Sequence, residues 1–211
     1  MRKQFDDQLG EVKSLLCGMC RTDAAAMRLT EMALSEGGAE IAEEIKECER
    51  ASDEKEREIE RLCMRIIVRW QPVAHDLALI TSAMKMVTDL ERITDQAADI
   101  AEITGRMKER GCIAPSALHE MMRVTVGMVE DCADALDTFD AAKARAVCRE
   151  DDAVDALFEA VKAELARSAE GGSEAGECAL DLLMIAKYLE RIGDHAVNAA
   201  EWIIFSEGLG R

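Results

Sequence analysis

Aromatic residues, prolines and long apolar runs are all scarce in this chain of 211 residues. Aromatic side chains make up only 3% of the sequence, although hydrophobic residues make up 49%. Methionine and alanine replace the β-branched and aromatic residues that strands favour. The two prolines, Pro72 and Pro115, stand where a helical pattern restarts rather than inside one. These scarcities predict an all-α fold.

The chain also lacks features of membrane and secreted proteins. No stretch approaches the roughly 18 uninterrupted apolar residues of a spanning helix, and the N-terminal segment has no apolar signal-peptide region. We therefore expect a soluble, cytoplasmic protein. Its 43 acidic and 26 basic residues give a net charge of −17. That charge repels nucleic acid and anionic lipid, so we expect no nucleic-acid partner and favour cations or cationic protein surfaces.

Eight cysteines are scattered along the chain without the compact spacing of a disulfide scaffold. Because a chain of this length can bury a large core, we expect reduced and mostly buried thiols. Cys17 and Cys20 form a single C-x-x-C pair. No second pair or nearby histidine completes a zinc site, so we attribute the spacing to coincidence on an amphipathic helix.

Helical periodicity is interrupted at five places, which divides the chain into six predicted helices. Their ranges are 4–35, 39–70, 73–109, 115–137, 140–168 and 174–206. An internal repeat organises them. Residues 86–102 align without a gap on 185–201, at an offset of 99, and eight of the seventeen positions are identical. Chance would give about one or two identities. The sequence thus predicts two tandem three-helix bundles, with domains at 1–110 and 111–211.

Each repeat copy carries an apolar stripe and an acidic stripe on one helix. The helical period places Leu90, Ile93, Ala97, Ile100 and Ala101 together as core positions. A separate stripe of the two copies contains Glu91, Asp95, Asp99 and Glu102, and Glu190, Asp194, Asn198 and Glu201. Like charges four residues apart cost a few tenths of a kcal/mol per pair, so a column of them favours a bound cation. Local relief by arginines on a solvated face is the alternative.

Two further acidic pairs precede the repeated helices. Glu49 with Asp53, and Asp151 with Asp155, have the same spacing on the second helix of each half. Since consecutive helices joined by short turns are antiparallel neighbours, each half could gather four carboxylates. Oxygen ligands suit Mg²⁺, Mn²⁺, Ca²⁺ or iron better than zinc or copper, and His195 could add one nitrogen. The other acids of 40–61 are expected to form a solvated face.

These segments resemble the PhoU family, in the same order and over essentially the whole chain. The resemblance lies in RIIVRWQPVAHDLALI at 65–80, the E-x-x-x-D repeats within LERITDQA and YLERIGDHAVNAAEW, and CREDDAVDALF at 148–158. It implies two three-helix bundles, homodimerisation and, in some members, metal clusters on the acidic stripes. The metal ligands that it implies here are Glu49, Asp53, Glu91, Asp95, Asp151, Asp155, Glu190 and Asp194, with Asp99 and Asn198 as outliers.

The same resemblance implies a negative regulator of phosphate uptake and phosphate-starvation signalling. Such a protein couples the ATPase of a phosphate ABC transporter to a membrane sensor histidine kinase, is cytoplasmic or peripheral at the inner membrane face through its partners, and is not an enzyme. The two copies differ at Thr94 and Gly193, and at Asp99 and Asn198, so equal metal binding by the two halves does not follow.

Three other functions compete with this one. An accessory subunit of another phosphate permease would share the bundle, and a metal-binding or spectrin-like scaffold would share the helical periodicity. A scaffold, however, needs only the apolar positions and not a repeated LERI-x-D. A ferritin-like oxidase needs E-x-x-H motifs. None exists, because Pro72, Ser116 and Ile192 stand three residues before the three histidines.

Overall fold

The computed structural model describes residues 2–168 and 173–208, and every element in this part of the chain is a helix. The helices are α1 (Arg2–Ser35), α2 (Ala39–Trp70), α3 (His75–Arg110), α4 (Ser116–Thr138), α5 (Ala141–Ser168) and α6 (Ser173–Gly208). The predicted all-α fold is confirmed, and each predicted helix end lies within two residues of the observed one. The predicted break after 168 falls partly on residues 169–172, outside the described residues.

Glycine and proline end the helices where the sequence predicts boundaries. Gly37 and Gly38 join α1 to α2 at φ 74° and 127°, a backbone region that favours glycine. Gly111 ends α3 at φ 71°, and its N–H bonds to the carbonyl of Lys108. Pro72 lies in the α2–α3 turn, and Pro115 stands immediately before α4, where its missing N–H costs nothing.

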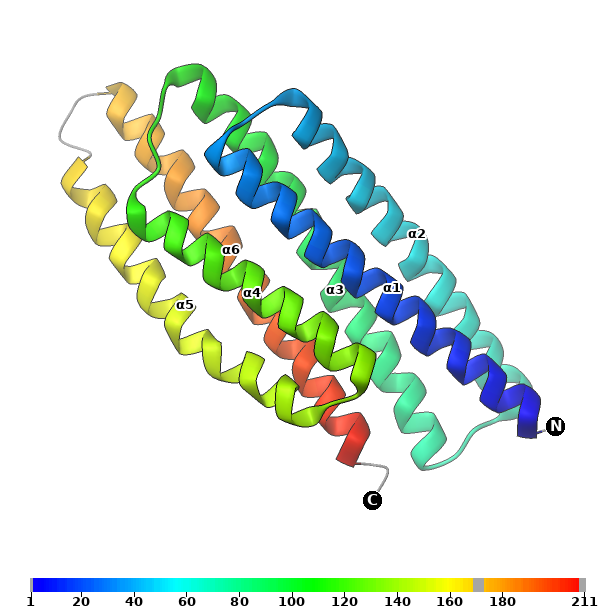
Figure 1. The fold of residues 1–211 in the computed structure, drawn as a ribbon. Coiled ribbons are helices and arrows are strands. Elements are labelled where there is room, and N and C mark those ends of the chain that lie inside the picture. Colours follow the sequence, from blue (N-terminus) through cyan, green and yellow to red (C-terminus); the bar gives the residue numbers. More distant parts are fainter. Residues whose placement is uncertain (1, 169–172, 209–211) are drawn as a thin grey trace.

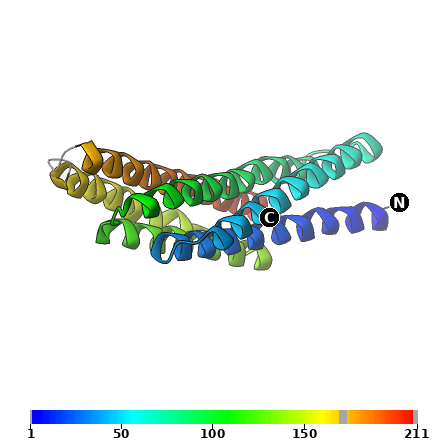
Figure 2. The ribbon, with the colours of Figure 1, turned by 90° about the horizontal axis from the view of Figure 1, so that it is seen from above.

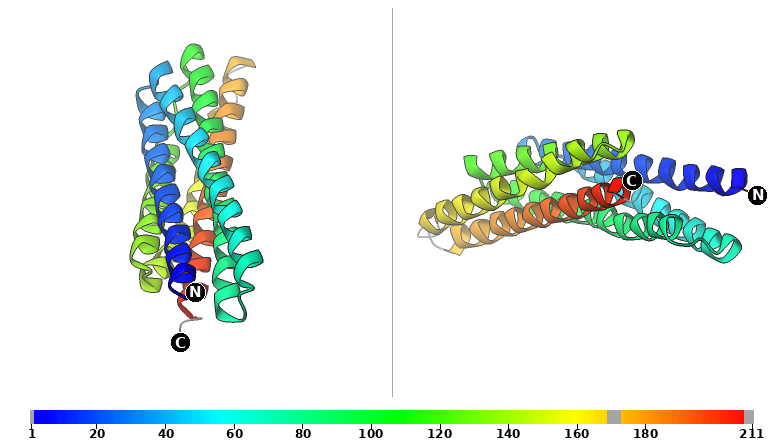
Figure 3. Two further views of the ribbon diagram at one scale, coloured as in Figure 1. Left: turned by 90° about the vertical axis from the view of Figure 1, so that its right-hand side faces the viewer. Right: turned by 90° about the horizontal axis from the view of Figure 1, so that it is seen from below.

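The six helices form two groups of three (Figure 1). Helices α1, α2 and α3 contact one another, as do α4, α5 and α6, and the two groups meet where α1 packs on α4 and α3 packs on α6. The two groups are offset along their length, so one end of the molecule, with the start of α1 and the α2–α3 turn, projects beyond the second group (Figures 2 and 3). No helix among the described residues is long and apolar enough to cross a membrane.

The core stripes of α3 and α6 pack where the sequence predicts them. Fully buried side chains line both helices: Leu90, Ile93, Ala97 and Ile100, and Leu189, Ile192, Ala196 and Ala200. Because aromatic residues are few, aliphatic side chains and methionines such as Met19 and Met121 fill the interior. Truncating one of the buried isoleucines to alanine would cost about 2–5 kcal/mol of stability. These stripes fix how α3 and α6 are rotated, and so which face carries the acids.

The cysteines only partly follow the prediction. Cys17, Cys20, Cys63 and Cys132 are buried free thiols, and two others are half-buried and free. Cys112 and Cys178, however, form a disulfide with Cα atoms 5.6 Å apart. The expectation of reduced thiols throughout is therefore wrong for this pair. Their 66-residue separation hid it, because only the folded chain brings the α3–α4 connection beside the start of α6.

Candidate functional site

The acids of α2 and α3 meet along the contact between these two helices. Asp53 lies on α2, while Glu91 and Asp95 lie one turn apart on α3. One carboxylate oxygen from each of the three lies within 4.8 Å of the other two, and all three side chains are half-buried. We call this group, with its neighbour Glu49, the first acidic cluster. The predicted antiparallel neighbourhood of the two helices thus brings the carboxylates together.

Burial disfavours the charged form of the carboxylates in the first acidic cluster. The side chain of Glu91 is only 13% exposed. Burial, and then the charge of Asp95, raise its pKa to about 7. Burial and the charge of Asp95 also raise the pKa of Glu49 above its usual range. The acidic stripe of α3 is thus partly covered by α2, and a cation there would offset both the burial and the repulsion.

Two arginines already partly neutralise the first acidic cluster. The guanidinium of Arg92 lies 3.3 Å from Glu91 and 3.2 Å from Asp95. Arg57 donates a hydrogen bond of 2.9 Å to Asp53. Both arginine side chains are at least half exposed, so each pair contributes at most about 1 kcal/mol. Local relief, the alternative to metal binding, is therefore present, but it is weak enough for a metal ion to displace.

Glu56 lies beside the first acidic cluster, where the sequence did not place it. Burial raises its pKa, followed by the charges of Glu60 and Asp53, and its own charge contributes to the raised pKa of Glu91. The acid-rich pattern of 40–61 predicts a solvated face that would include this residue. Its spacing held the missing signal, because Glu56 lies one turn beyond Asp53 and on the same side of α2.

The second half brings its four predicted acids together on α5 and α6. Burial, and then the charges of Asp155 and Asp194, raise the pKa of Asp151. Burial, and then the charge of Glu190, raise the pKa of Asp194. We call these four residues the second acidic cluster. Lys187, one turn before Glu190, is paired with it.

The two clusters are not equivalent. If Asp151 is aligned with Glu49, then Phe158 and Lys162 stand where the first half has Glu56 and Glu60. The ammonium groups of Lys162 and Lys187 lie 5.2 Å and 5.6 Å from the Phe158 ring centre. In the described residues, three carboxylates converge within 4.8 Å in the first cluster alone. Lys187 therefore lies beside the second cluster, whereas Lys162 is paired with Glu159, outside it.

Asn198 and His195 face a different neighbour. Asn198 donates a hydrogen bond of 3.1 Å to Asp89 on α3, and Nδ1 of His195 lies 3.0 Å from the same carboxylate oxygen. Asp99 adds to the raised pKa of both Glu49 and Tyr188, so it lies between the first acidic cluster and the α3–α6 interface. Through these contacts Asn198 and His195 join the two halves.

The family model described as PhoU domain matches the chain twice, at residues 16–104 and 118–203. The chain belongs to the PhoU family. A Pseudomonas putida protein named phosphate-specific transport system accessory protein PhoU homolog is 34% identical over 206 residues, covering 96% of this chain and 80% of the relative. A protein of the same name from Zymomonas mobilis is 36% identical, covering 97% of this chain and 86% of the relative.

Solved PhoU structures share the fold over nearly the full length. The crystal structure of PhoU from Pseudomonas aeruginosa matches with a TM-score of 0.90 and 31% identity, covering 97% of this chain and 99% of that one. The phosphate transport system regulatory protein PhoU from Streptococcus pneumoniae matches with a TM-score of 0.86 and 27% identity, covering 96% of both chains. Each matched PhoU domain lies within one predicted domain, 1–110 or 111–211.

Proposed function

We propose that this chain is a cytoplasmic negative regulator of phosphate uptake and of phosphate-starvation signalling. The match of two PhoU domains, together with relatives named as accessory proteins of phosphate-specific transport along nearly the whole chain, carries the proposal. The role requires no catalysis. Of the three histidines, His75 and His119 are exposed near helix starts, and His195 is engaged by Asp89.

The regulator would act by binding the ATPase of a phosphate ABC transporter and a membrane sensor histidine kinase. A surface suited to such a partner lies at the projecting end of the molecule. Met64, Val68 and Val73 are 50%, 72% and 75% exposed around the α2–α3 turn, and Arg65 and Arg69 lie among them. We call these five residues the projecting patch. Methionine and arginine are enriched in protein interfaces, and exposed apolar side chains this close together favour a docking role.

We further propose that the first acidic cluster holds a metal ion. Three carboxylates converge there and repel one another. Such a group of oxygen ligands suits a hard cation, namely Mg²⁺, Mn²⁺ or iron, better than Zn²⁺. Asp53, Glu91 and Asp95 would be ligands, with Glu49 and Glu56 close enough to assist. The ion would supply charge neutralisation that ties α2 to α3. The second acidic cluster, in which Lys187 already pairs with Glu190, would bind more weakly.

Deletion of the gene tests the regulatory proposal. Phosphate uptake and a phosphate-starvation reporter are measured in phosphate-rich medium, in the deletion strain and in a strain complemented with the wild-type chain. We expect both to rise on deletion and to return on complementation. Unchanged values in the deletion strain would reject negative regulation and favour a metal-binding scaffold.

Pull-down with purified partners tests the coupling. The chain should retain the transporter ATPase and the cytoplasmic part of the kinase. Retention of a different phosphate permease and not of these two would show the alternative, an accessory subunit of that permease. Light scattering during size-exclusion chromatography tests the proposed homodimer, which predicts twice the 23.2 kDa chain mass.

A further inference from the structure

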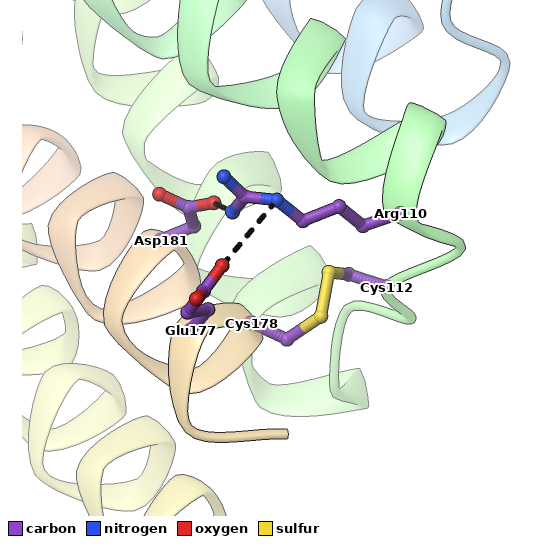
Figure 4. The surroundings of a disulfide bond; sticks show 5 residues. All are labelled: Arg110, Cys112, Glu177, Cys178 and Asp181. Carbon is purple, nitrogen blue, oxygen red and sulfur yellow. Dashed lines mark hydrogen bonds and ion pairs between the residues drawn. A yellow bond between two sulfur atoms is a disulfide. The ribbon is translucent and has the colours of Figure 1, made fainter. Parts of the chain in front are cut away.

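One corner of the molecule brings two distant cysteines together (Figure 4). Cys112 is the first residue after the Gly111 cap of α3, and its N–H bonds to the carbonyl of Met107. Cys178 lies in the second turn of α6. Both side chains are half-buried, and their sulfurs are joined. We propose that this pair is a reversible oxidation site, whose disulfide fastens the start of α6 to the connection between the two halves.

The six other thiols are less suited to reaction with an external oxidant, because Cys20 and Cys132 are almost fully buried and the pKa of each of the other four is raised. Burial raises the pKa of Cys17 and of Cys63 to about 11. Burial also raises the pKa of the half-buried Cys48 and Cys148. Because the thiolate is the reacting form, these thiols react slowly near neutral pH. A mild oxidant that equilibrates with the chain should therefore leave them free.

Ion pairs beside the disulfide hold the two segments together when the bond is open. Arg110, two residues before Cys112, lies 2.6 Å from Asp181 and 3.8 Å from Glu177 (Figure 4). Asp181 is one turn beyond Cys178, and Glu177 precedes it. The reduced thiols would thus remain close, and closing the bond would be an intramolecular step with a high effective concentration.

The oxidant class that fits is a small-molecule disulfide such as glutathione disulfide. One cysteine thiolate of the pair attacks a glutathione sulfur, which forms a mixed disulfide and releases one glutathione thiolate. The second cysteine thiolate then attacks the protein sulfur of the mixed disulfide and releases the other glutathione. The protein dithiol loses two electrons and two protons, and glutathione disulfide becomes two molecules of glutathione. Excess glutathione reverses both steps.

The rest of the fold does not require the disulfide. Disulfides are essential mainly in small domains that lack a sufficient core. Here fully buried apolar side chains run along all six helices, so each half has its own core. Opening the bond should therefore loosen the start of α6, which Arg110 still holds near the α3–α4 connection, while the bundles remain folded. Partial exposure of both cysteines leaves them accessible to glutathione.

Thiol mapping in glutathione buffers tests the site on the full chain. The protein is equilibrated at several ratios of glutathione to its disulfide and quenched with acid. It is then unfolded in denaturant so that every free thiol can be alkylated, and peptides are identified by mass spectrometry. We expect six alkylated thiols under oxidising ratios, eight under reducing ratios, and Cys112 linked to Cys178 in the former. Eight alkylated thiols at every ratio, or a different pair, would overturn the proposal. A disulfide that glutathione at roughly 10 mM does not reduce in the native protein would also overturn the proposal.

Melting curves and variants test the effect of the disulfide and of the ion pairs of Arg110 beside it. The oxidised wild type should melt roughly 5–15 °C above its reduced form. Cys112→Ser should melt at the same temperature under oxidising and reducing conditions, and that temperature should equal that of the reduced wild type. Hydrogen exchange at 173–181 should be faster in the reduced protein, and unchanged exchange would reject a local release. Arg110→Gln should lower the equilibrium constant for oxidation roughly 2–5-fold, while Arg106→Gln, whose ion pair with Glu102 lies within α3, should leave it unchanged.

Discussion

Asn198 donates a hydrogen bond of 3.1 Å to Asp89 and so ties α6 to α3 across the junction of the two halves. In the alignment of the two repeats, at an offset of 99 residues, Tyr188 is equivalent to Asp89 and Asn198 is equivalent to Asp99. A hydrogen bond with Asp99 is among the causes that raise the pKa of Tyr188, after burial. The same two positions of the repeat are therefore in contact twice, once as Asp89 with Asn198 and once as Asp99 with Tyr188. In both meetings α3 supplies the acidic acceptor and α6 supplies the donor, which explains why the repeat has aspartate in one copy and asparagine in the other.

The first prediction tests this division of roles. Asn198→Asp replaces a donor with a second carboxylate next to Asp89, so it should lower the free energy of unfolding by about 1–2 kcal/mol at pH 7. The control is Asp99→Asn, which keeps an oxygen that Tyr188 can bond to and should change stability by less than about 0.5 kcal/mol. Urea denaturation measures both. Equal effects of the two substitutions would contradict the assignment.

The second prediction concerns the projecting patch. Val68→Asp should abolish binding to the transporter ATPase or to the kinase, because a charge in an apolar contact leaves an unpaired buried group in the complex. Val68 is 72% exposed in the free protein, so the variant should have the melting temperature of the wild type. Met32→Asp, at a position 45% exposed on α1, is the matched control and should bind normally. If Val68→Asp binds both partners as well as wild type does, docking lies elsewhere.

The fold could be predicted from the sequence because its signals are local. The apolar stripe with Leu90 and Ile93 repeats in register at Leu189 and Ile192, and the prolines mark helix boundaries. Short turns then leave little choice but antiparallel packing. The pairing of four acids in each half followed from the same reasoning, since it needs only the rotation of each helix and its nearest neighbour.

What the sequence could not supply depends on contacts between distant helices. The Cys112–Cys178 bond and the Asp89–Asn198 contact both join elements that are far apart in the chain. No periodicity within one helix reveals such partners. Glu56 is a different kind of miss, because its spacing was visible but was interpreted as part of a solvated face. Burial against α3 distinguishes it from its exposed neighbours.

The third prediction is a pH dependence in the chelator-treated protein. The pKa of Glu91 is about 7 in the folded state, against an ordinary value near 4.5. Between these values the folded state binds more protons than the unfolded state, so stability falls as pH rises from about 4.5 to 7. After allowance for solvent screening, the loss should be about 1–2 kcal/mol. Glu91→Gln cannot ionise and should remove most of it, as measured by urea denaturation across this range.

The control for this pH dependence is Glu102→Gln on the same helix. The side chain of Glu102 is 71% exposed and paired with Arg106. The variant should keep the wild-type pH dependence. If Glu91→Gln instead retains the full slope, the buried carboxyl responsible is another one, and Asp23 would be the next to test. Asp23 is fully buried, and burial raises its pKa well above the usual range.

The last prediction separates the two acidic clusters by their metal affinity. If the first cluster binds a metal ion, a hundredfold excess over the dissociation constant should stabilise the wild type by about 2.7 kcal/mol, or roughly 5–11 °C in melting temperature. Asp53→Asn with Asp95→Asn replaces two converging carboxylates with neutral amides and should abolish the shift. The matched double variant in the second half, Asp155→Asn with Asp194→Asn, should keep most of it. In that cluster Lys187 is already paired with Glu190.

Melting curves with Mg²⁺, Mn²⁺ or Fe²⁺, each with and without chelator, distinguish the possible outcomes. Without metal, the first double variant should melt slightly higher than wild type, because it loses like-charge repulsion at Glu91 and Glu49. A shift lost equally in both double variants would mean that the halves bind alike, and that Phe158 and Lys162 do not weaken the second cluster. No shift in the wild type would leave Arg57 and Arg92 as the counter-ions of the first cluster. The raised pKa of Glu91 would then be the cost of packing α2 against α3.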